Sequence, residues 1–533
     1  MNGLEHQTEL ILGLMAIIAV LVTLARRLAL PYPILLVIGG IGLSLVPDLP
    51  HIRMAPEIVF LLFLPPLLYE ESYFTSWRDL RANIRPISLL AFGLVLATTA
   101  IVGAAAHWAI PALSWPVAFV LGAVVAPTDE AAVMPVIERM AVPRRVATII
   151  SDESLVNDAV SLVVYRLAVV AVVTGSFSFA RAGAQFIVVS VCGVLIGLVI
   201  AWLASHLMKR LDDPSVEITV SLIIPFVTYF TAENFNASGV LAVVSLGIYM
   251  GRTAATGRSP QSRVEARAVW ETLVFLLNGF LFLLVGLQLR SILQSHTGIS
   301  IKVQVISALL ISLTCVIVRI AWVFASVYIP HALSRKLRQR EPAPSWRSIM
   351  IVAWTGIRGG LSLAAALAIP LTLGNGAPFP HRDMMIFLTY CVILVTLVLQ
   401  GLTLPILIRV LKVKSDRSRE EEENNARLQG TRAALSRLDI LSDESWAPAE
   451  VSEHLREHYL AKLRLLEGRV HGSSNITSET NRSAYSKLHE ELLAAEHRAI
   501  VLMRDEGEIE DDVLHTIERD LDLQRVQLGT EEK

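Results

Sequence analysis

The stretch S-D-E-S-L-V-N-D-A-V, Ser151 to Val160, puts polar and ionisable side chains into a segment that is otherwise apolar from 144 to 174. A carboxylate in the lipid core costs about 2.5 kcal/mol or more unless it faces protein or water, so such residues mark ion paths or proton relays. The stretch therefore predicts a membrane helix built around a site. Its candidate residues are Glu153, Ser154, Asn157 and Asp158.

The composition indicates an all-α polytopic membrane protein. Of the 533 residues, 53% are hydrophobic, and the mean hydropathy is +0.56, above that of an average soluble protein. The chain carries no nucleic-acid signature. Its three cysteines lie in apolar segments without metal-ligand spacing, which predicts neither a disulfide framework nor a zinc site.

About thirteen membrane helices are expected from apolar runs of roughly 17 to 25 residues. Residues 1–411 then form a membrane domain and residues 412–533 a cytoplasmic helical domain, where Leu455, Tyr459, Leu463 and Leu466 recur at helical spacing. The expected spans are 8–25, 32–47, 56–72, 85–110, 116–140, 144–174, 182–208, 215–232, 237–251, 269–290, 302–330, 346–373 and 383–411.

Basic residues gather in alternate loops, which predicts the orientation because Lys and Arg concentrate in short cytoplasmic loops. The N-terminus is expected outside the cell and the tail in the cytoplasm. One set of loops is basic throughout the chain, with Arg26, Arg27, Arg78, Arg81, Arg144, Arg145, Lys209, Arg210, Arg335 and Lys336 among its residues, whereas the opposite set holds Arg53, Arg181, Arg290, Lys302 and Arg382.

Four charged residues are expected at one depth near the middle of the membrane. Asp129, Asp158, Arg319 and Arg358 each lie about 12 to 17 residues into a span, at a rise of about 1.5 Å per residue. Buried charges must find each other or water. The cluster is consistent with an ion site or with a buried ion-pair network that holds helices together.

Two neighbouring polar stripes follow from the spacing in the span 144–174. Ser154 and Asp158 are four residues apart, as are Glu153 and Asn157. One stripe is expected to face an ion and the other a structural partner.

Two spans are expected to break near the membrane centre. Pro127 and Pro135 remove helix hydrogen bonds from the span 116–140, and the glycines of W-T-G-I-R-G-G-L-S weaken the span 346–373 at matching depth. Interrupted spans in corresponding positions of two halves are typical of inverted-repeat transporters, whose site lies between the halves. The alternative is two ordinary kinks.

The span 56–72 ends in F-L-P-P-L-L-Y-E-E-S and carries two further acids. Glu70 is expected to face inward, whereas Glu71 is expected to reach the water at the cytoplasmic end.

These motifs together resemble the monovalent cation:proton antiporter-1 family, the sodium/proton exchangers, and especially its long bacterial members with a cytoplasmic extension. The resemblance covers about residues 1–411. It rests on F-L-P-P-L-L-Y-E (Phe63 to Glu70), P-T-D (Pro127 to Asp129), E-S-L-V-N-D (Glu153 to Asp158) and G-I-R-G-G-L-S-L-A (Gly356 to Ala364).

The resemblance implies a homodimer whose protomers have a dimerisation domain and a mobile core domain. Asp158 would bind the ion or the proton, with Asn157 as its hydrogen-bonding neighbour. The candidate direct or water-mediated cation ligands are Asp129, Thr128, Ser154 and Glu70. Glu153 and Arg358 would form a structural ion pair, and Arg319 is a possible modulator.

Two acids depart from the family pattern. Glu130 stands where relatives commonly have proline, and Asp152 stands where they often have glycine. Both are expected to modulate the ion preference or the pH response of the site.

Exchange of Na+ or Li+ for H+ across the bacterial inner membrane is the expected function, with cation and proton competing for Asp158. Asn157 before the key acid resembles electroneutral exchangers. The partners are the cation, the proton, membrane lipid and a second copy of the chain, with no cofactor and no enzymatic activity. A K+/H+ antiporter of the same fold stays open as the closest alternative. A cation channel is less favoured, because the sequence has no repeated pore loop or carbonyl filter motif, and so is an intramembrane protease, because Asp129 and Asp158 lack a recognisable protease setting. The tail either senses pH or a ligand, or stabilises the dimer.

Overall fold

The computed structural model describes residues 2–470 with gaps at 29, 47–58, 141, 176–178, 212, 258–259, 295–299, 336–338, 340–343, 374–375, 414–417 and 445, and it describes short pieces after residue 491. The chain divides into two compact units, residues 1–416 and 417–533. Each unit is described by itself.

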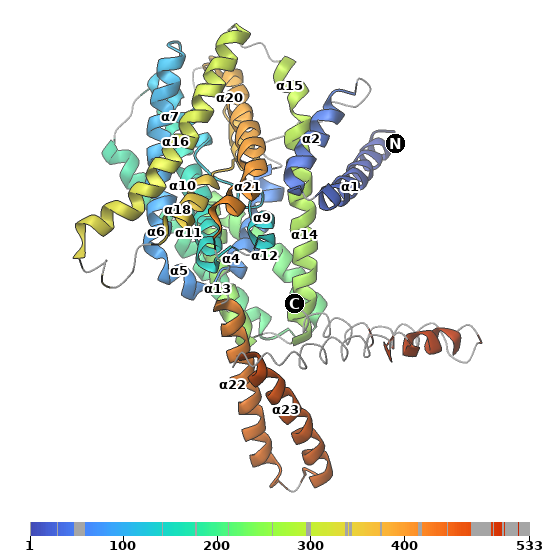
Figure 1. The fold of residues 1–533 in the computed structure, drawn as a ribbon. Coiled ribbons are helices and arrows are strands. Elements are labelled where there is room, and N and C mark those ends of the chain that lie inside the picture. The colour runs from blue at the N-terminus through green and yellow to red at the C-terminus, as the bar shows by residue number, and fades with distance from the viewer. Residues whose placement is uncertain are drawn as a thin grey trace. The chain divides into compact units, whose positions relative to one another are not determined.

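The first unit is a bundle of helices (Figure 1). Three segments are π-helical turns: η1 directly precedes α4, η2 lies between α6 and α7, and η3 lies between α20 and α21. The helices are α1 (Asn2–Leu28), α2 (Tyr32–Ser44), η1 (Val59–Phe63), α4 (Leu64–Phe74), α5 (Trp77–Ala82), α6 (Ile84–Ser88), η2 (Leu89–Leu94), α7 (Val95–Ala109), α8 (Trp115–Val124), α9 (Met134–Arg139), α10 (Arg144–Thr174), α11 (Phe179–Met208), α12 (Pro214–Asn234), α13 (Gly239–Gly257), α14 (Pro260–Leu287), α15 (Leu289–Gln294), α16 (Ile301–Leu333), α18 (Trp346–Trp354), α19 (Gly360–Leu367), α20 (Arg382–Val395), η3 (Thr396–Gln400) and α21 (Gly401–Leu411).

Each expected span of this unit contains helical structure in its described residues. Within the described residues, eight helices are long and apolar enough to cross a membrane, and α2, α8 and part of α13 are shorter apolar helices. Both predicted interruptions are confirmed, because the span 116–140 divides into α8 and α9 and the span 346–373 into α18 and α19. The count of thirteen and the inverted repeat stay predictions.

The helix α10, which carries the quoted stretch, has well-defined ends. It begins directly after Pro143, whose ring removes a backbone donor that the first helical turn does not use. It ends at Gly175, whose φ of 64° is a left-handed conformation that glycine adopts without a steric penalty. The polar residues 151–158 therefore lie within one uninterrupted helix.

The helices of the first unit pack in two sets. The first helix set contains α1, α2, α4 and α11 to α14, and the second helix set contains α6 to α10, α16 and α18 to α21. Figure 1 shows α1, α2 and α14 on one side of the unit and α7 and α16 on the other. The two sets meet mainly where α10 and α19 contact α4, α11, α13 and α14.

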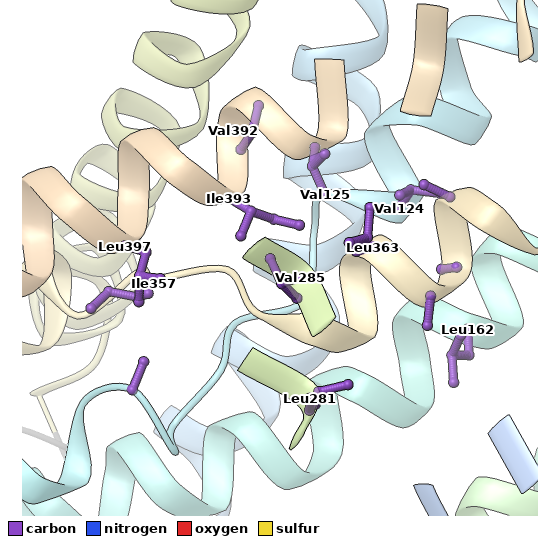
Figure 2. Close-up of a cluster of buried hydrophobic side chains, with 14 of the residues drawn as sticks. Val124, Val125, Leu162, Leu281, Val285, Ile357, Leu363, Val392, Ile393 and Leu397 are labelled. Carbon is purple, nitrogen blue, oxygen red and sulfur yellow. The ribbon is translucent and has the colours of Figure 1, made fainter. Parts of the chain in front are cut away.

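Apolar side chains fill the space around the two interruptions. Figure 2 shows Val124 and Val125 from the end of α8, Ile357 from the unwound segment before α19, and Leu281 and Val285 from α14. All five have at most 6% of their surface exposed. This packing removes water from the unwound backbone, so its polar groups need partners within the protein.

The second unit contains the helices α22 (Ser418–Leu441) and α23 (Ala449–Val470), which pack against each other. Ion pairs of 2.8 Å link Arg432 to Glu467 and Asp439 to Arg456. The helix expected from the spacing of Leu455 to Leu466 is confirmed as part of α23, with Leu466 buried and Leu455 exposed.

Candidate functional site

The two unwound segments, 125–133 and 355–359, are joined by a backbone hydrogen bond and by the Arg358 side chain. The N–H of Asp129 donates to the carbonyl of Ile357 at 2.8 Å. The Nε of Arg358 donates to the carbonyl of Val125 at 3.1 Å, and its Nη1 donates to the carbonyl of Gly356. Since α8 and α18 stop at these points, the hydrogen bonds satisfy backbone groups that the broken helices leave unpaired.

Opposite charges stand at opposite helix ends in this crossing. The Arg358 guanidinium, 1% exposed, lies at the C-terminal end of α8, where the helix dipole is negative. The Asp129 carboxylate accepts from the N–H of Ala131 at 2.9 Å and packs against Gly359, directly before the N-terminus of α19. A Cβ at Gly359 would overlap this carboxylate, so the close approach requires glycine.

The expected ion pair between Glu153 and Arg358 is wrong, because Glu153 pairs with Arg319. Arg319 on α16 donates to both carboxylate oxygens of Glu153, at 2.6 and 2.9 Å, and to the carbonyl of Val352 on α18 at 3.2 Å. Both partners of the ion pair are 1% exposed. Arg358 donates to the backbone carbonyls that are left without helix partners where α8 and α18 end. Arg319, in contrast, joins α10 to α16 and α18.

Two of the expected cation ligands, Thr128 and Ser154, form a hydrogen-bonded group with Asn157 between α10 and the unwound segment. The Ser154 hydroxyl donates to the carbonyl of Thr128 at 2.6 Å. The Nδ2 of Asn157 donates to the hydroxyl oxygen of Thr128 at 2.8 Å. These contacts hold the segment of Thr128 and Asp129 against the helix that carries Asp158.

A cavity of about 100 Å³ lies at the boundary between the two helix sets. Asp158 is half-buried and lines it, whereas Asn157 is buried behind Thr128. The expected residues in its lining are Glu70, Thr128, Asp129, Ser154 and Asp158, and its further polar residues are Glu71, Glu130, Asn278 and Ser362. The structure thus brings five of the six predicted ion-binding residues to one cavity.

The expectation that Glu71 reaches the water is wrong, because Glu71 lines this cavity beside Glu70. The sequence does contain a signal for this placement. Leu64, Leu67, Leu68 and Glu71 follow the spacing of a single helix face, and all four line the cavity. Glu71 therefore lies on the face that α4 turns toward α10, not at the edge of the bundle.

The two acids that depart from the family pattern differ in whether they line the cavity. Glu130 lines the cavity. Asp152 is 3% exposed and does not line it. On α10, the Ser154 and Asp158 stripe faces the cavity, while Glu153 faces its structural partner Arg319.

Carboxylate, hydroxyl and carbonyl oxygens converge on the cavity, and such oxygen ligands suit hard cations. A carboxylate that is partly removed from water has a raised affinity for protons. The arrangement thus places carboxylates that can hold a proton and oxygen atoms that suit a cation in one cavity, at a boundary between two packed sets of helices.

Comparison with known proteins agrees with this chemistry. The sodium/hydrogen exchanger transmembrane family matches residues 13–410. An uncharacterised Na+/H+ exchanger of Mycobacterium tuberculosis is 34% identical over 535 residues, covering 99% of this chain and 97% of the relative. A sodium, potassium, lithium and rubidium/H+ antiporter of Bacillus subtilis is 31% identical over 526 residues, covering 95% and 76%.

The fold has a solved counterpart in a sodium proton antiporter of Methanocaldococcus jannaschii. The two structures superpose with a TM-score of 0.63 at 20% sequence identity, covering 76% of this chain and 99% of the other. The relatives named here are transporters and not enzymes. The chain belongs to the sodium/hydrogen exchanger family.

Proposed function

We propose that the protein exchanges Na+, and also Li+, for H+ across the cell membrane, with both ions competing for the Asp158 carboxylate. The observation that carries the proposal is the cavity itself. Asp158 opens into it together with Ser154 and the Thr128 segment, while the neighbouring Glu153 is fully paired elsewhere. One carboxylate that holds either ion, but not both, couples the two fluxes.

Transport in this proposal proceeds by movement of the second helix set relative to the first. The Glu153 and Arg319 pair and the crossing at Asp129 and Ile357 join α10, α16, α18 and the unwound segments into one body. The cavity lies at the edge of that body, so a shift of the body carries Asp158 past α4 and α14.

The setting that we propose is the bacterial inner membrane, with the N-terminus outside, the tail in the cytoplasm and two copies of the chain in a homodimer. The basic loops support this orientation. In this setting the protein would serve pH homeostasis and sodium tolerance. The order Asn157-Asp158 supports electroneutral exchange, because only one of the two side chains titrates.

The range of cations is the point at which relatives differ. The Bacillus subtilis relative is named for sodium, potassium, lithium and rubidium, and the oxygen ligands of the cavity suit any of these ions. K+/H+ exchange by the same site is therefore the second candidate, and the experiment below separates it from Na+/H+ exchange.

The test measures proton flux in proteoliposomes that hold a pH gradient, after addition of Na+, Li+ or K+. Wild type, Asp158→Asn and the control Asp383→Asn are compared. Asp383 is half-exposed in the first turn of α20 and does not line the cavity. A membrane-potential dye recorded in the same vesicles reports whether charge moves during exchange.

Collapse of the gradient by Na+ or Li+ in wild type and in the control, but not in Asp158→Asn, is the expected result. A response to K+ of similar size would assign the broader cation range. Flux of equal size in Asp158→Asn would contradict the role of Asp158, and a cation-driven potential would contradict electroneutrality.

A further inference from the structure

A second cavity of the first unit lies inside the second helix set, apart from the ion site. Its volume is about 230 Å³, compared with about 100 Å³ for the cavity of Asp158, and the two cavities share no lining residue. Residues from α6, the start of α10, the end of α16 and the start of α18 line it. This second cavity is larger than a single small ion requires, and the proposed exchange does not use it.

The ionisable side chains that line the second cavity are basic. They are Arg85 on α6, Arg145 on α10 and His331 on α16, and no acidic residue in the described part of the chain lines it. The Nε of Arg145 donates to the Oδ1 of Asn83 at 3.2 Å, which holds this side chain beside α6. Guanidinium groups match the geometry of phosphate oxygens, which accept two parallel N–H bonds from one arginine. The charge of the second cavity therefore favours an anion.

The side chain of His331 gives evidence for a ligand that is independent of the arginines. His331 is 8% exposed, and its Nδ1 donates to the carbonyl of Val327 at 2.7 Å, because a carbonyl oxygen can only accept. Its Nε2 is buried and has no hydrogen-bond partner among the residues that the structure describes. A buried polar atom of this kind calls for a partner, and His331 lines the second cavity. When the ring is protonated, Nε2 donates to an oxyanion in that cavity.

The helix α18 begins at the same cavity, with Ser345 as its N-cap. The Ser345 hydroxyl oxygen accepts from the N–H of Ser348 at 3.2 Å, and both serines line the cavity. The first turn of a helix carries a partial positive charge, because its first N–H groups have no partner within the helix. Such helix ends bind phosphate groups, so the start of α18 adds to the attraction of the two arginines.

Apolar side chains form much of the remaining wall, which indicates a ligand larger than an inorganic ion. An ion alone gains nothing from a hydrophobic surface, whereas the organic part of an ester is removed from water there. This apolar wall includes Val146 and Ile149 on α10, Val323 and Val327 on α16, and Ile349 and Val352 on α18.

A ligand in the second cavity would contact the same helices that the ion pair of Glu153 and Arg319 joins. Arg319 on α16 donates to the carbonyl of Val352 on α18 at 3.2 Å, and Val352 lines the cavity. The helices α10, α16 and α18 all contribute to the apolar wall. Contacts of one ligand with all three add to the ion pair, so binding stabilises the second helix set.

We propose that the second cavity binds a phosphate ester, with the phosphate at Arg85, Arg145, His331 and the start of α18, and with the organic part against the apolar wall. The ester comes either from the membrane, as an anionic lipid, or from solution, as a small phosphorylated compound. Bound ester stabilises the second helix set against unfolding. The proposal goes beyond the proposed exchange and does not depend on it.

The test measures thermal unfolding of the full-length protein, purified in detergent and washed free of lipid, at increasing concentrations of a probe. The probes are dioctanoyl phosphatidic acid, dioctanoylglycerol, glycerol phosphate and inorganic phosphate. The first two carry the same chains with and without phosphate, and the third carries the phosphate without the chains. Native mass spectrometry counts the phosphatidic acid molecules that stay bound.

Wild type is compared with the cavity variants Arg85→Gln and His331→Ala and with the matched controls Arg78→Gln and His206→Ala. Arg78 is exposed on α5 and does not line the second cavity. His206 on α11 makes the same kind of bond as His331, from Nδ1 to the carbonyl of Trp202 at 2.9 Å, but it is exposed and does not line the cavity.

Phosphatidic acid is expected to raise the unfolding temperature of wild type and of both controls, whereas dioctanoylglycerol is not. Each cavity variant loses one charge-assisted hydrogen bond to the phosphate, which should weaken the apparent affinity by about tenfold. Equal affinity in wild type and both cavity variants would overturn the proposal. Equal stabilisation by dioctanoylglycerol, or no effect of any phosphate probe, would overturn it as well.

The remaining probes distinguish the two sources of the ester. Tighter binding of phosphatidic acid than of glycerol phosphate would assign the cavity to an anionic lipid, and equal binding would assign it to a soluble phosphate ester. Inorganic phosphate that binds as tightly as both esters would contradict the role of the apolar wall.

The unfolding temperature of each variant without a probe shows whether the variant is folded. Arg85 and His331 lie on different helices, so a folding defect in one variant leaves the other to decide the outcome.

Discussion

Glu153 and Asp158 lie on the same helix, less than two turns apart, and the structure gives them opposite surroundings. Glu153 is 1% exposed and accepts two hydrogen bonds from Arg319. Asp158 is half-buried and opens into a cavity together with four other acids of its lining. A carboxylate with an arginine at both oxygens has little capacity left for an exchangeable ion, so the tertiary partner assigns the structural role to one acid and the transport role to the other.

The largest effect on the contrast between Glu153 and Asp158 is expected when Arg319 is removed. Arg319→Met leaves Glu153 as an uncompensated buried charge, which is expected to destabilise the protein by about 3–5 kcal/mol. The measurement is the thermal unfolding of purified protein in detergent. Asp158→Asn is expected to unfold close to wild type, because it removes a charge that already faces the cavity.

The double variant Glu153→Gln, Arg319→Met serves as the control for that prediction. It removes both charges, so it should regain most of the lost stability. Loss of equal size in the single and the double variant would show that packing around Arg319, not the charge pair, determines the stability.

The crossing of the unwound segments is expected to show the next largest effect. In Gly359→Ala the new Cβ overlaps the Asp129 carboxylate, which should cost about 2 kcal/mol of stability and slow exchange. Thermal unfolding and Na+-driven proton flux are measured together. Gly42→Ala on α2 is the matched control, since a Cβ there meets no atom within 4 Å. Equal behaviour of the two variants would show that the close approach at Gly359 is unimportant.

A smaller effect is expected where a hydrogen bond positions a ligand. Asn157→Ala removes the donor to the Thr128 hydroxyl and should cost about 1 kcal/mol, which corresponds to an increase of roughly fivefold in the Na+ concentration for half-maximal exchange. The maximal rate should change less than this concentration. An Asn157→Ala variant with no flux at any Na+ concentration would instead place Asn157 directly in the ion site.

The smallest effect on exchange is expected from removal of the second unit. All residues of the candidate site lie in the unit of residues 1–416. A chain truncated after residue 416 should therefore retain Na+-driven flux in proteoliposomes. An unchanged pH profile would exclude a regulatory tail, whereas a shifted profile with retained flux would support one.

Much of the site was accessible from the pattern of residues along the chain. The prolines at 127 and 135 and the glycines at 356, 359 and 360 predicted two breaks at one depth, and both breaks are present. The i,i+4 spacing separated the Ser154 and Asp158 stripe from Glu153. These predictions succeeded because they depend on backbone chemistry and helix periodicity, which are local properties.

The wrong predictions concern partners. Arg319 and Arg358 lie at similar depth, and depth alone does not decide which of them meets Glu153. The breaks themselves decide it, because the free carbonyls of Val125 and Gly356 engage Arg358 and leave Glu153 to Arg319. Glu71 was predicted to reach the water. The spacing of the residues on its helix indicates the face on which Glu71 lies, but nothing in the sequence states that this face meets α10.

The sequence by itself determined the membrane-embedded helical class, the two broken helices and the acid on which exchange is expected to depend. Each follows from hydropathy, from the loss of helix hydrogen bonds or from the cost of a charge in lipid. Only the tertiary structure decided which arginine neutralises Glu153 and which oxygens share a cavity with Asp158. The physical reason is that pairing between distant helices depends on how the helices rotate and pack, and a sequence pattern records only which face is polar.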